Sequence, residues 1–358
     1  MGISVLEIDR DFERSFLAPE LRALSTFSPD VVVDDFSFTT AHTTRLKRVP
    51  RVSVLRKGVF PGDRPRKPGH VHSGQLEWLM ETWPLGALGL PRPKEASELF
   101  VGKVNIIPSI PSVEPLPEPQ LDERNFIYSG PLRVDDTTVL ANISAFDSGI
   151  LDEVERGWGA SLADFLPVAR VEEFLGRHRG SRPIAYLTIG LARHANLAPF
   201  LPGCIDLLLD RGAAVVTNVE ADLGRDPSRA DRYLYSAFLP MDLVCSRCDL
   251  MIHQCGSGTY AAQIDHRLPA ITLGTMCYDR EDVALRLEEL GASVHVVSPA
   301  EDDDFLGRFS RAVDLFLGAD PPARAAARAA VSKLSEETAK IREGFDFRKV
   351  LEAAVTSA

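Results

Sequence analysis

The chain has 358 residues, a formal net charge of −11, and a composition that is 45% hydrophobic and 25% charged. This length suggests about two domains of roughly 100–200 residues each, and the composition is typical of a globular protein with apolar cores. The negative charge argues against binding to nucleic acid, because affinity for a phosphate backbone depends mainly on cationic side chains.

Targeting and redox signals are weak. No stretch reaches the ~20 apolar residues that a membrane helix needs, and the N-terminus lacks the basic and then apolar regions of a signal peptide. The five cysteines lie in the second half without regular spacing, which does not suggest a disulfide framework. Cys245 and Cys248 form a CxxC pair without a second pair, so we interpret them as partly buried thiols. We expect a cytoplasmic protein without a membrane span.

The first half alternates between strand and helix patterns. In chain order we expect a helix over 16–28, a buried strand over 31–33, a short helix over 39–48 and a strand in "VPRVSVLR". This βαβ rhythm predicts a parallel sheet with helices on its faces. Residues 56–70 are expected to form a loop, and the many prolines of 91–120 predict little regular structure there. A short strand is expected in "NFIYSGPL".

The second half has a more complete alternating pattern, which predicts an α/β domain. Its expected strands are "PIAYLTIGLA", "GAAVVTNV", "YLYSAFLP", "DLMIHQ", "PAITLG" and "SVHVV". Its expected helices are 197–210, 259–266, 280–290 (ended by Gly291), 321–342 and 346–356.

A small polar turn, "HQCGSGT", follows the apolar strand of "CDLMIHQ" and precedes a helix. In an open parallel sheet, ligands bind beyond the carboxyl ends of the strands. Small residues let the backbone approach a ligand, and the helix N-terminus offers unpaired N–H groups that suit a phosphate. We expect Ser257 and Thr259 to cap the helix, and His253 or Gln254 to add a donor. The alternative is a tight, well-capped turn without a ligand.

Several stretches resemble GT-B glycosyltransferases, in particular the branch of UDP-glycosyltransferases and bacterial antibiotic sugar transferases. Over 126–300 the matching pieces occur in the family's order: "FIYSGPL", "YLTIG", "AFLPM", "CDLMIHQCGSGT" and "LPAITLGTMCYDRED". The resemblance implies an α/β fold with two Rossmann-like domains facing a cleft, the N-terminal one incomplete. The implied parts are an acceptor-binding domain over 1–135, a linker or insert over 136–165, a donor domain over 166–335 and a C-terminal helical segment over 336–358 that packs back on the first domain.

The resemblance also implies an activity, that of a hexosyltransferase-type enzyme. Such an enzyme transfers a sugar from a UDP- or dTDP-sugar to a hydroxyl of a small-molecule acceptor, with inversion and without a metal ion. The nucleotide sugar is a substrate, so no cofactor is expected. Arginine greatly outnumbers lysine, a bias typical of GC-rich bacterial genomes, which favours natural-product biosynthesis.

The family's functional residues carry over to specific positions. Those implied to bind the nucleotide sugar are Gly190, Phe238, Leu239, His253, Gln254, Gly256, Ser257, Gly258, Thr259, Asp279 and Arg280. Phe238 would stack on the base, and Asp279 would bind hydroxyls of the sugar. Asp34 matches an acidic residue that orients a catalytic histidine and is the one catalytic candidate. The alternatives are that Phe238 is a core residue, Asp279 a helix cap and Asp34 or Asp35 a solvated strand end.

The sequence also departs from the family pattern. Gln254 stands where the family usually has histidine, and Arg280 where it usually has glutamine. Only 28 residues precede "PDVVV", so the leading segment with the usual catalytic histidine has no counterpart here. Either the start codon lies further upstream or the protein is a shortened member. His42 is expected on a helix surface rather than as a base.

Two rival functions remain open from the sequence alone. One is a catalytically degenerate protein that only binds a nucleotide sugar or a partner. The other is a nucleotide-sugar epimerase, which needs several carboxylates in its cleft. Asp34, Asp35 and Asp279 are too few to favour that chemistry.

Overall fold

The computed structural model describes residues 16–70, 80, 91–117, 125–133, 168–190, 195–224, 226–318 and 322–356. The chain divides into two compact units. Unit 1 comprises the residues up to 132, the short segment 277–283 and the residues from 336 onward, and unit 2 comprises 133–276 and 284–335. The domain boundaries predicted at 135, 165 and 335 stay predictions.

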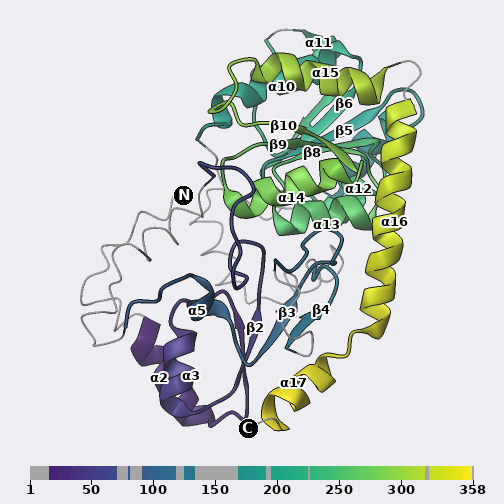
Figure 1. The fold of residues 1–358 in the computed structure, drawn as a ribbon. Helices are drawn as coiled ribbons and strands as arrows, with labels where there is room; N and C mark the ends of the chain where they lie inside the picture. Colours follow the sequence, from purple (N-terminus) through teal and green to yellow (C-terminus); the bar gives the residue numbers. More distant parts are fainter. Residues whose placement is uncertain are drawn as a thin grey trace. The chain divides into compact units, whose positions relative to one another are not determined.

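Unit 1 is built on a parallel sheet with the strand order β1-β2-β3-β4 (Figure 1). Its strands are β1 (Val32–Asp35), β2 (Arg51–Val54), β3 (Val104–Ile107) and β4 (Phe126–Tyr128). Helix α2 (Ala18–Phe27) packs beside α3 (Thr40–Lys47). The predicted strand-helix-strand unit near the start of the chain is therefore confirmed.

The proline-rich stretch over 91–120 contains only short regular elements, the helix α5 (Ser97–Phe100) and the buried strand β3, of four residues each. The prolines of this stretch lie before Ser97 or after Ile107, so none of them interrupts either element. This agrees with the expectation that the prolines allow no long regular element here.

The C-terminal helix α17 (Phe347–Thr356) covers one face of the unit 1 sheet. Val350 and Ala354 of this helix are buried against Val52 and Val104 of the sheet. The ammonium of Lys103 also donates a hydrogen bond to the carbonyl of Ala354, with 2.8 Å between the two atoms. The last helix of the chain thus completes the core of the unit that contains the first strand.

Unit 2 contains a larger parallel sheet with the order β10-β9-β8-β5-β6-β7. The strands are β5 (Ile184–Thr188), β6 (Ala214–Thr217), β7 (Tyr233–Tyr235), β8 (Leu250–His253), β9 (Ala270–Leu273) and β10 (Ser293–Val296). All of them coincide with predicted strands. Chain order reverses between β5 and β8, as in a doubly wound fold.

Helices cover both faces of the unit 2 sheet, because the strands are apolar along their length and therefore present apolar residues to both faces (Figure 1). Ala185 and Leu187 of β5 pack with α10 (Leu201–Asp210) and α15 (Phe305–Leu317). Ile184 and Tyr186 face the other way, and pack in a cluster with residues of α9 (Val168–His178), α12 (Met241–Cys245) and α13 (Ser257–Asp265).

The remaining described elements are η3 (Ala198–Phe200), α11 (Pro227–Ala230), α14 (Tyr278–Glu289) and α16 (Pro322–Gly344). All five predicted helices of the second half are present, whereas α9, α11, α12 and α15 were not predicted. Cys245 and Cys248 are buried free thiols, as interpreted from the sequence. Within the described parts of the chain, no helix combines the length and the apolar character needed to cross a membrane.

Candidate functional site

The carboxyl ends of β5 and β8 mark the point where the strand order of unit 2 reverses. The connections from these two strands lead in opposite directions, toward β6 and toward β9, and a crevice between such loops is the usual ligand site of an open parallel sheet. Gly190 follows β5, and the turn over 254–256 follows β8 and enters α13. The candidate site is therefore built from these two strand ends.

The turn after β8 has an open helix N-terminus. Cys255 has a φ of 57°, a left-handed conformation that reverses the chain after the strand. Gly256 is the N-cap of α13, and no side chain caps the helix. The prediction that Ser257 and Thr259 cap the helix is wrong. Ser257 is already the first helical residue, and the Thr259 hydroxyl donates back to the Gly256 carbonyl at 2.8 Å.

His253 stabilises this turn from inside the protein. Its side chain is fully buried, and its Nδ1 accepts a hydrogen bond from the Cys255 N–H at 3.1 Å. Nε2 therefore carries the proton and donates to Oε1 of Gln263, also at 3.1 Å. Burial lowers the pKa of His253 to about 4, against the opposing effect of the Gln263 hydrogen bond. Both ring nitrogens are engaged, so in this conformation His253 positions the turn and offers no donor to a ligand.

Gln254 lies between the two strand ends. It is 3% exposed, and among the described residues its side-chain Oε1 has no hydrogen-bond partner. A Cβ atom on Gly190 would lie 2.7 Å from the Gln254 Nε2, and Gly190 also has a φ of 62°. Only glycine fits there without displacing the amide. A buried amide with an unsatisfied oxygen costs free energy, which points to a ligand that completes its hydrogen bonding.

Two residues that the sequence analysis missed support this arrangement. The Asn218 side chain, just after β6, accepts from the Ile189 N–H at 3.3 Å and donates to the Gly190 carbonyl at 3.0 Å. Gln263, on α13, holds His253 and donates to the Ala292 carbonyl at 3.0 Å. The letters "TN", Thr217 at the end of β6 and Asn218 just after it, indicate a polar strand end in the sequence. The hydrogen-bond partners of Asn218 and Gln263, however, are set by the tertiary fold.

Phe238 and Leu239 lie in the loop that follows β7, at the edge of the same sheet. Both are half-buried, and the Ser236 hydroxyl donates to the Phe238 carbonyl at 2.7 Å, which fixes the loop backbone. Leu239 packs against the apolar cluster below the sheet. Phe238 as a whole is neither buried nor exposed, which leaves its predicted role in base stacking open.

Asp279 and Arg280 lie in the first turn of α14, both half-buried. The Cys277 thiol donates to the Asp279 Oδ1 at 3.1 Å. Burial, and next the negative charge of Asp279, raise the pKa of Cys277, so the thiol keeps its proton. Asp279 is inside the helix and not its N-cap, since α14 begins at Tyr278.

Asp34 is a buried residue of unit 1 with structural partners. It is 4% exposed, its Oδ2 lies 3.1 Å from Nη1 of Arg51, and its Oδ1 accepts from the Ser37 N–H at 2.9 Å. Burial raises the pKa of Asp34, whereas the Ser37 N–H and the Arg51 charge lower it. Asp35 points to the other face of β1 and pairs with Arg56 at 3.2 Å in an exposed ion pair. Asp34 is therefore not the solvated strand end that was its alternative.

No protein-family model matches the sequence. A curated relative, the aclacinomycin-T 2-deoxy-L-fucose transferase of Streptomyces galilaeus, is 22% identical over 284 residues, which are 75% of this chain and 55% of that protein. The chain thus spans about half the length of the curated relative it matches.

Solved structures share the fold over most of the chain. Spinosyn forosaminyltransferase SpnP has a TM-score of 0.60 at 18% identity, over 95% of this chain and 80% of that one. The glycosyltransferase VinC, solved in complex with dTDP, has a TM-score of 0.58 at 16% identity, over 94% of this chain and 75% of that one. The chain has the GT-B fold of these glycosyltransferases.

Proposed function

We propose that this chain binds a nucleoside diphosphate sugar and transfers the sugar to a hydroxyl of a small-molecule acceptor. The observation that carries the proposal is the site at the reversal of strand order, where an uncapped helix N-terminus meets the buried, unsatisfied amide of Gln254. The dTDP complex of VinC, a protein of the same fold, supports a nucleoside diphosphate as the ligand.

The diphosphate would bind the first turn of α13. The first N–H groups of a helix have no partner within it, and the helix dipole favours an anion at that end. Gly256 and Gly258 have no side chains that would keep a ligand away, and Gly258 has no heavy atom within 4 Å of the place where a Cβ would be. Gln254 would rotate its amide so that Nε2 takes the place of the unpartnered Oε1 and donates to the diphosphate. A hydrogen bond to a charged group is worth about 1.5–3 kcal/mol.

The remaining donor contacts follow the sequence prediction. We propose that the Phe238 ring stacks on the base, beside the backbone of Leu239, and that Asp279 accepts hydrogen bonds from sugar hydroxyls. Arg280, its neighbour in the same helical turn, is the other predicted contact of the nucleotide sugar on this helix. The two carboxylate oxygens of Asp279 and its half-buried position suit a hydroxyl-rich ligand.

In the transfer step, the acceptor oxygen bonds to the anomeric carbon while the bond from that carbon to the diphosphate breaks. Attack from the opposite face inverts the anomeric centre. In this proposal the departing negative charge is stabilised by the N-terminal N–H groups of α13 and by Gln254, without a metal ion or a further cofactor. Asp34 stays a predicted catalytic residue. Its contacts with Arg51 give it a structural role, and no proton transfer is assigned to it.

Five free cysteines support a reducing, cytoplasmic location.

Calorimetric titration with dTDP, UDP and their glucose conjugates tests the donor site. We expect the wild-type chain to bind at least one of them at about micromolar affinity, or roughly 8 kcal/mol. In Gly258→Val the branched side chain occupies the space in front of the helix, and binding should weaken at least about 100-fold, or roughly 2.7 kcal/mol. Gly176→Val on the exposed face of α9 is the matched control, because Gly176 also has open space around it.

Absence of binding to all four compounds by a folded wild-type chain would refute the proposed function. Binding without any sugar transfer or donor hydrolysis would instead favour the second candidate, a protein that binds nucleotide sugars without catalysis. The structural engagement of Asp34 is the observation that keeps this candidate in consideration.

A further inference from the structure

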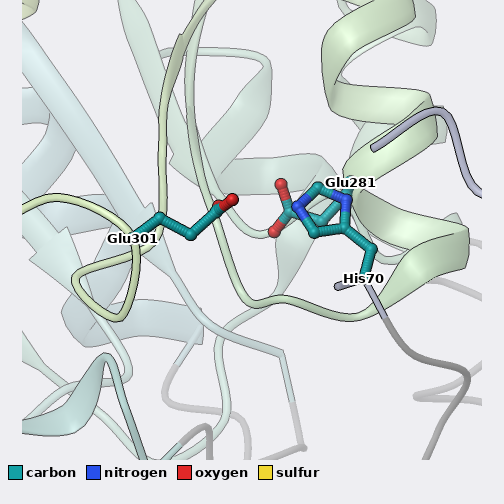
Figure 2. A group of neighbouring side chains, drawn as sticks. All are labelled: His70, Glu281 and Glu301. Carbon is teal, nitrogen blue, oxygen red and sulfur yellow. The ribbon is translucent and has the colours of Figure 1, made fainter. Parts of the chain in front are cut away.

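Figure 2 shows a group of titratable side chains that the proposed function does not use, His70, Glu281 and Glu301. His70 and Glu281 are buried residues of unit 1, whereas Glu301 is an exposed residue of unit 2. Because these residues do not belong to one unit, no site is assigned to them. His42, also in unit 1, is buried on α3 and does not lie on a helix surface as the sequence predicted. The strand ends of unit 2 form a network whose contacts all lie within that unit.

The backbone just after β5 is held by side chains. The Gly190 N–H donates to the Thr188 hydroxyl at 3.2 Å, and the Gly190 carbonyl accepts from the Asn218 amide at 3.0 Å. The Ile189 N–H donates to the same Asn218 side chain at 3.3 Å. Gly190 has a φ of 62°, and glycine loses more conformational freedom on folding than any other residue. These three hydrogen bonds therefore fix a backbone that has many other conformations open to it.

Asn218 is itself part of a fixed loop. The residues after β6 are held by Tyr233 of β7, whose hydroxyl donates to the Val219 carbonyl at 2.7 Å and accepts from the Ala221 N–H at 2.9 Å. The Val219 N–H also donates to the Thr217 hydroxyl at 3.0 Å. Strand β7 and the loops after β6 and β5 are thus joined by hydrogen bonds between side chains and backbone. Asn218 is the link between the last two.

The same backbone lies against Gln254. A Cβ atom on Gly190 would lie 2.7 Å from Nε2 of Gln254, so the Gly190 backbone borders the space in which this amide sits. Gln254 is 3% exposed, and within the described parts of the chain its Oε1 has no hydrogen-bond partner. In a close-packed interior, such an amide is held in place mainly by the atoms around it. Its position therefore depends on where the Gly190 backbone lies.

We propose that Asn218 is a positioning residue of the donor site. It holds the Gly190 backbone against Gln254, and so keeps the amide in the place from which it reaches the diphosphate. The inference rests on the proposed function, in which Gln254 donates to the diphosphate. Asn218 needs no contact with the ligand for this role. A binding site whose groups are ordered before the ligand arrives loses less free energy on binding, so removing Asn218 should weaken the affinity for a nucleoside diphosphate.

A second asparagine provides a matched control. In unit 1, Asn105 on β3 also holds a glycine backbone. Its Oδ1 accepts from the Gly102 N–H at 2.8 Å, and its Nδ2 donates to the carbonyls of Gly102 at 3.3 Å and Asn125 at 3.0 Å. Asn105 is 1% exposed, whereas Asn218 is half-buried, so Asn105→Ala should destabilise the fold at least as much as Asn218→Ala. Asn105→Ala thus shows what a loss of stability alone does to ligand binding.

The test is calorimetric titration of the full chain and its variants with dTDP, beside urea denaturation of each ligand-free chain. Asn218→Ala should weaken dTDP binding by about 10-fold, which corresponds to roughly one hydrogen bond. Asn218→Ser, whose shorter side chain cannot bridge both backbone groups, should show a similar loss. Asn105→Ala should leave the dTDP affinity within about 2-fold of wild type, because distant sites act independently. Unchanged dTDP affinity in both Asn218 variants, or an equal loss in Asn105→Ala, would overturn the inference.

The double variant Asn218→Ala/Gln254→Ala tests whether Asn218 acts through Gln254. In a chain that already lacks the Gln254 amide, Asn218→Ala should change dTDP affinity by less than about 2-fold, so the two effects should not add. A merely structural role of Asn218 would produce the same loss in both backgrounds, and that outcome would refute the positioning role. A wild-type chain that binds dTDP while the Asn218 variants bind it equally well would refute only this inference. A wild-type chain that does not bind dTDP would refute the proposed function as well.

Discussion

Replacing Arg51 with methionine is expected to lower the free energy of unfolding by about 3–5 kcal/mol, as for other buried ion pairs that lose one partner. Nη1 of Arg51 lies 3.1 Å from the Asp34 carboxylate and 2.9 Å from the Leu99 carbonyl, and Nη2 lies 2.7 Å from the Val101 carbonyl. Arg51→Met keeps most of the apolar stem and removes all three hydrogen bonds. It leaves the Asp34 charge buried without its partner, and this is the main cause of the expected loss.

Urea denaturation of Arg51→Met and of Arg56→Met measures the difference. Arg56 forms an ion pair with Asp35, which lies on the same strand as Asp34, but both side chains of this pair are exposed. Losing the Arg56–Asp35 pair should therefore lower the free energy of unfolding by less than about 1 kcal/mol. In the double variant Arg51→Met/Asp34→Leu the stranded charge is gone, and part of the stability should return. Equal costs for the two single variants would show that Asp34 does not depend on Arg51, and its structural role would be refuted.

His253→Gln is expected to make the chain less sensitive to acid. Burial holds the pKa of His253 at about 4 in the folded chain, whereas a histidine in the unfolded chain takes up its proton near the ordinary value of 6.5. Between these values the unfolded state binds more protons, so stability falls as the pH falls through this window. Each pKa unit corresponds to about 1.4 kcal/mol, so the loss over these 2.5 units amounts to at most about 3.5 kcal/mol.

Unfolding free energies of the wild type and of His253→Gln, measured between neutral pH and about pH 4, test this expectation. Glutamine keeps a donor and an acceptor for Gln263 and the Cys255 N–H, but it does not titrate. Other groups titrate in the same range in both proteins, so the quantity to compare is the difference between the two pH profiles. If both proteins lose the same stability on acidification, His253 is not buried in its neutral form.

The strands of unit 2 were predictable because a parallel sheet covered on both faces has strands that are continuous apolar runs. "AVVT" and "LMIH" are such runs, and each is a strand in the structure. Helix α15 was not predicted, although its buried residues Phe305, Phe309, Val313 and Phe316 recur at helical spacing. That spacing is a sufficient signal for an amphipathic helix, so no physical obstacle prevented its prediction.

The site was less predictable than the fold. The sequence marked the small turn before α13, but it suggested side-chain caps where the structure has an open N-terminus. It also offered His253 or Gln254 as a donor without deciding between them, whereas in the structure His253 is enclosed by Gln263 and Gln254 faces Gly190. These differences come from contacts between residues far apart in the chain.

The most direct test of the donor site is a crystal structure of the full chain with dTDP. We predict diphosphate oxygens within about 3 Å of the backbone N–H groups at the start of α13, the usual hydrogen-bond distance. We also predict a Gln254 amide turned to donate to them, and a thymine ring against Phe238. A dTDP molecule bound elsewhere on the chain, with the α13 N-terminus and Gln254 unchanged, would contradict the proposed donor site.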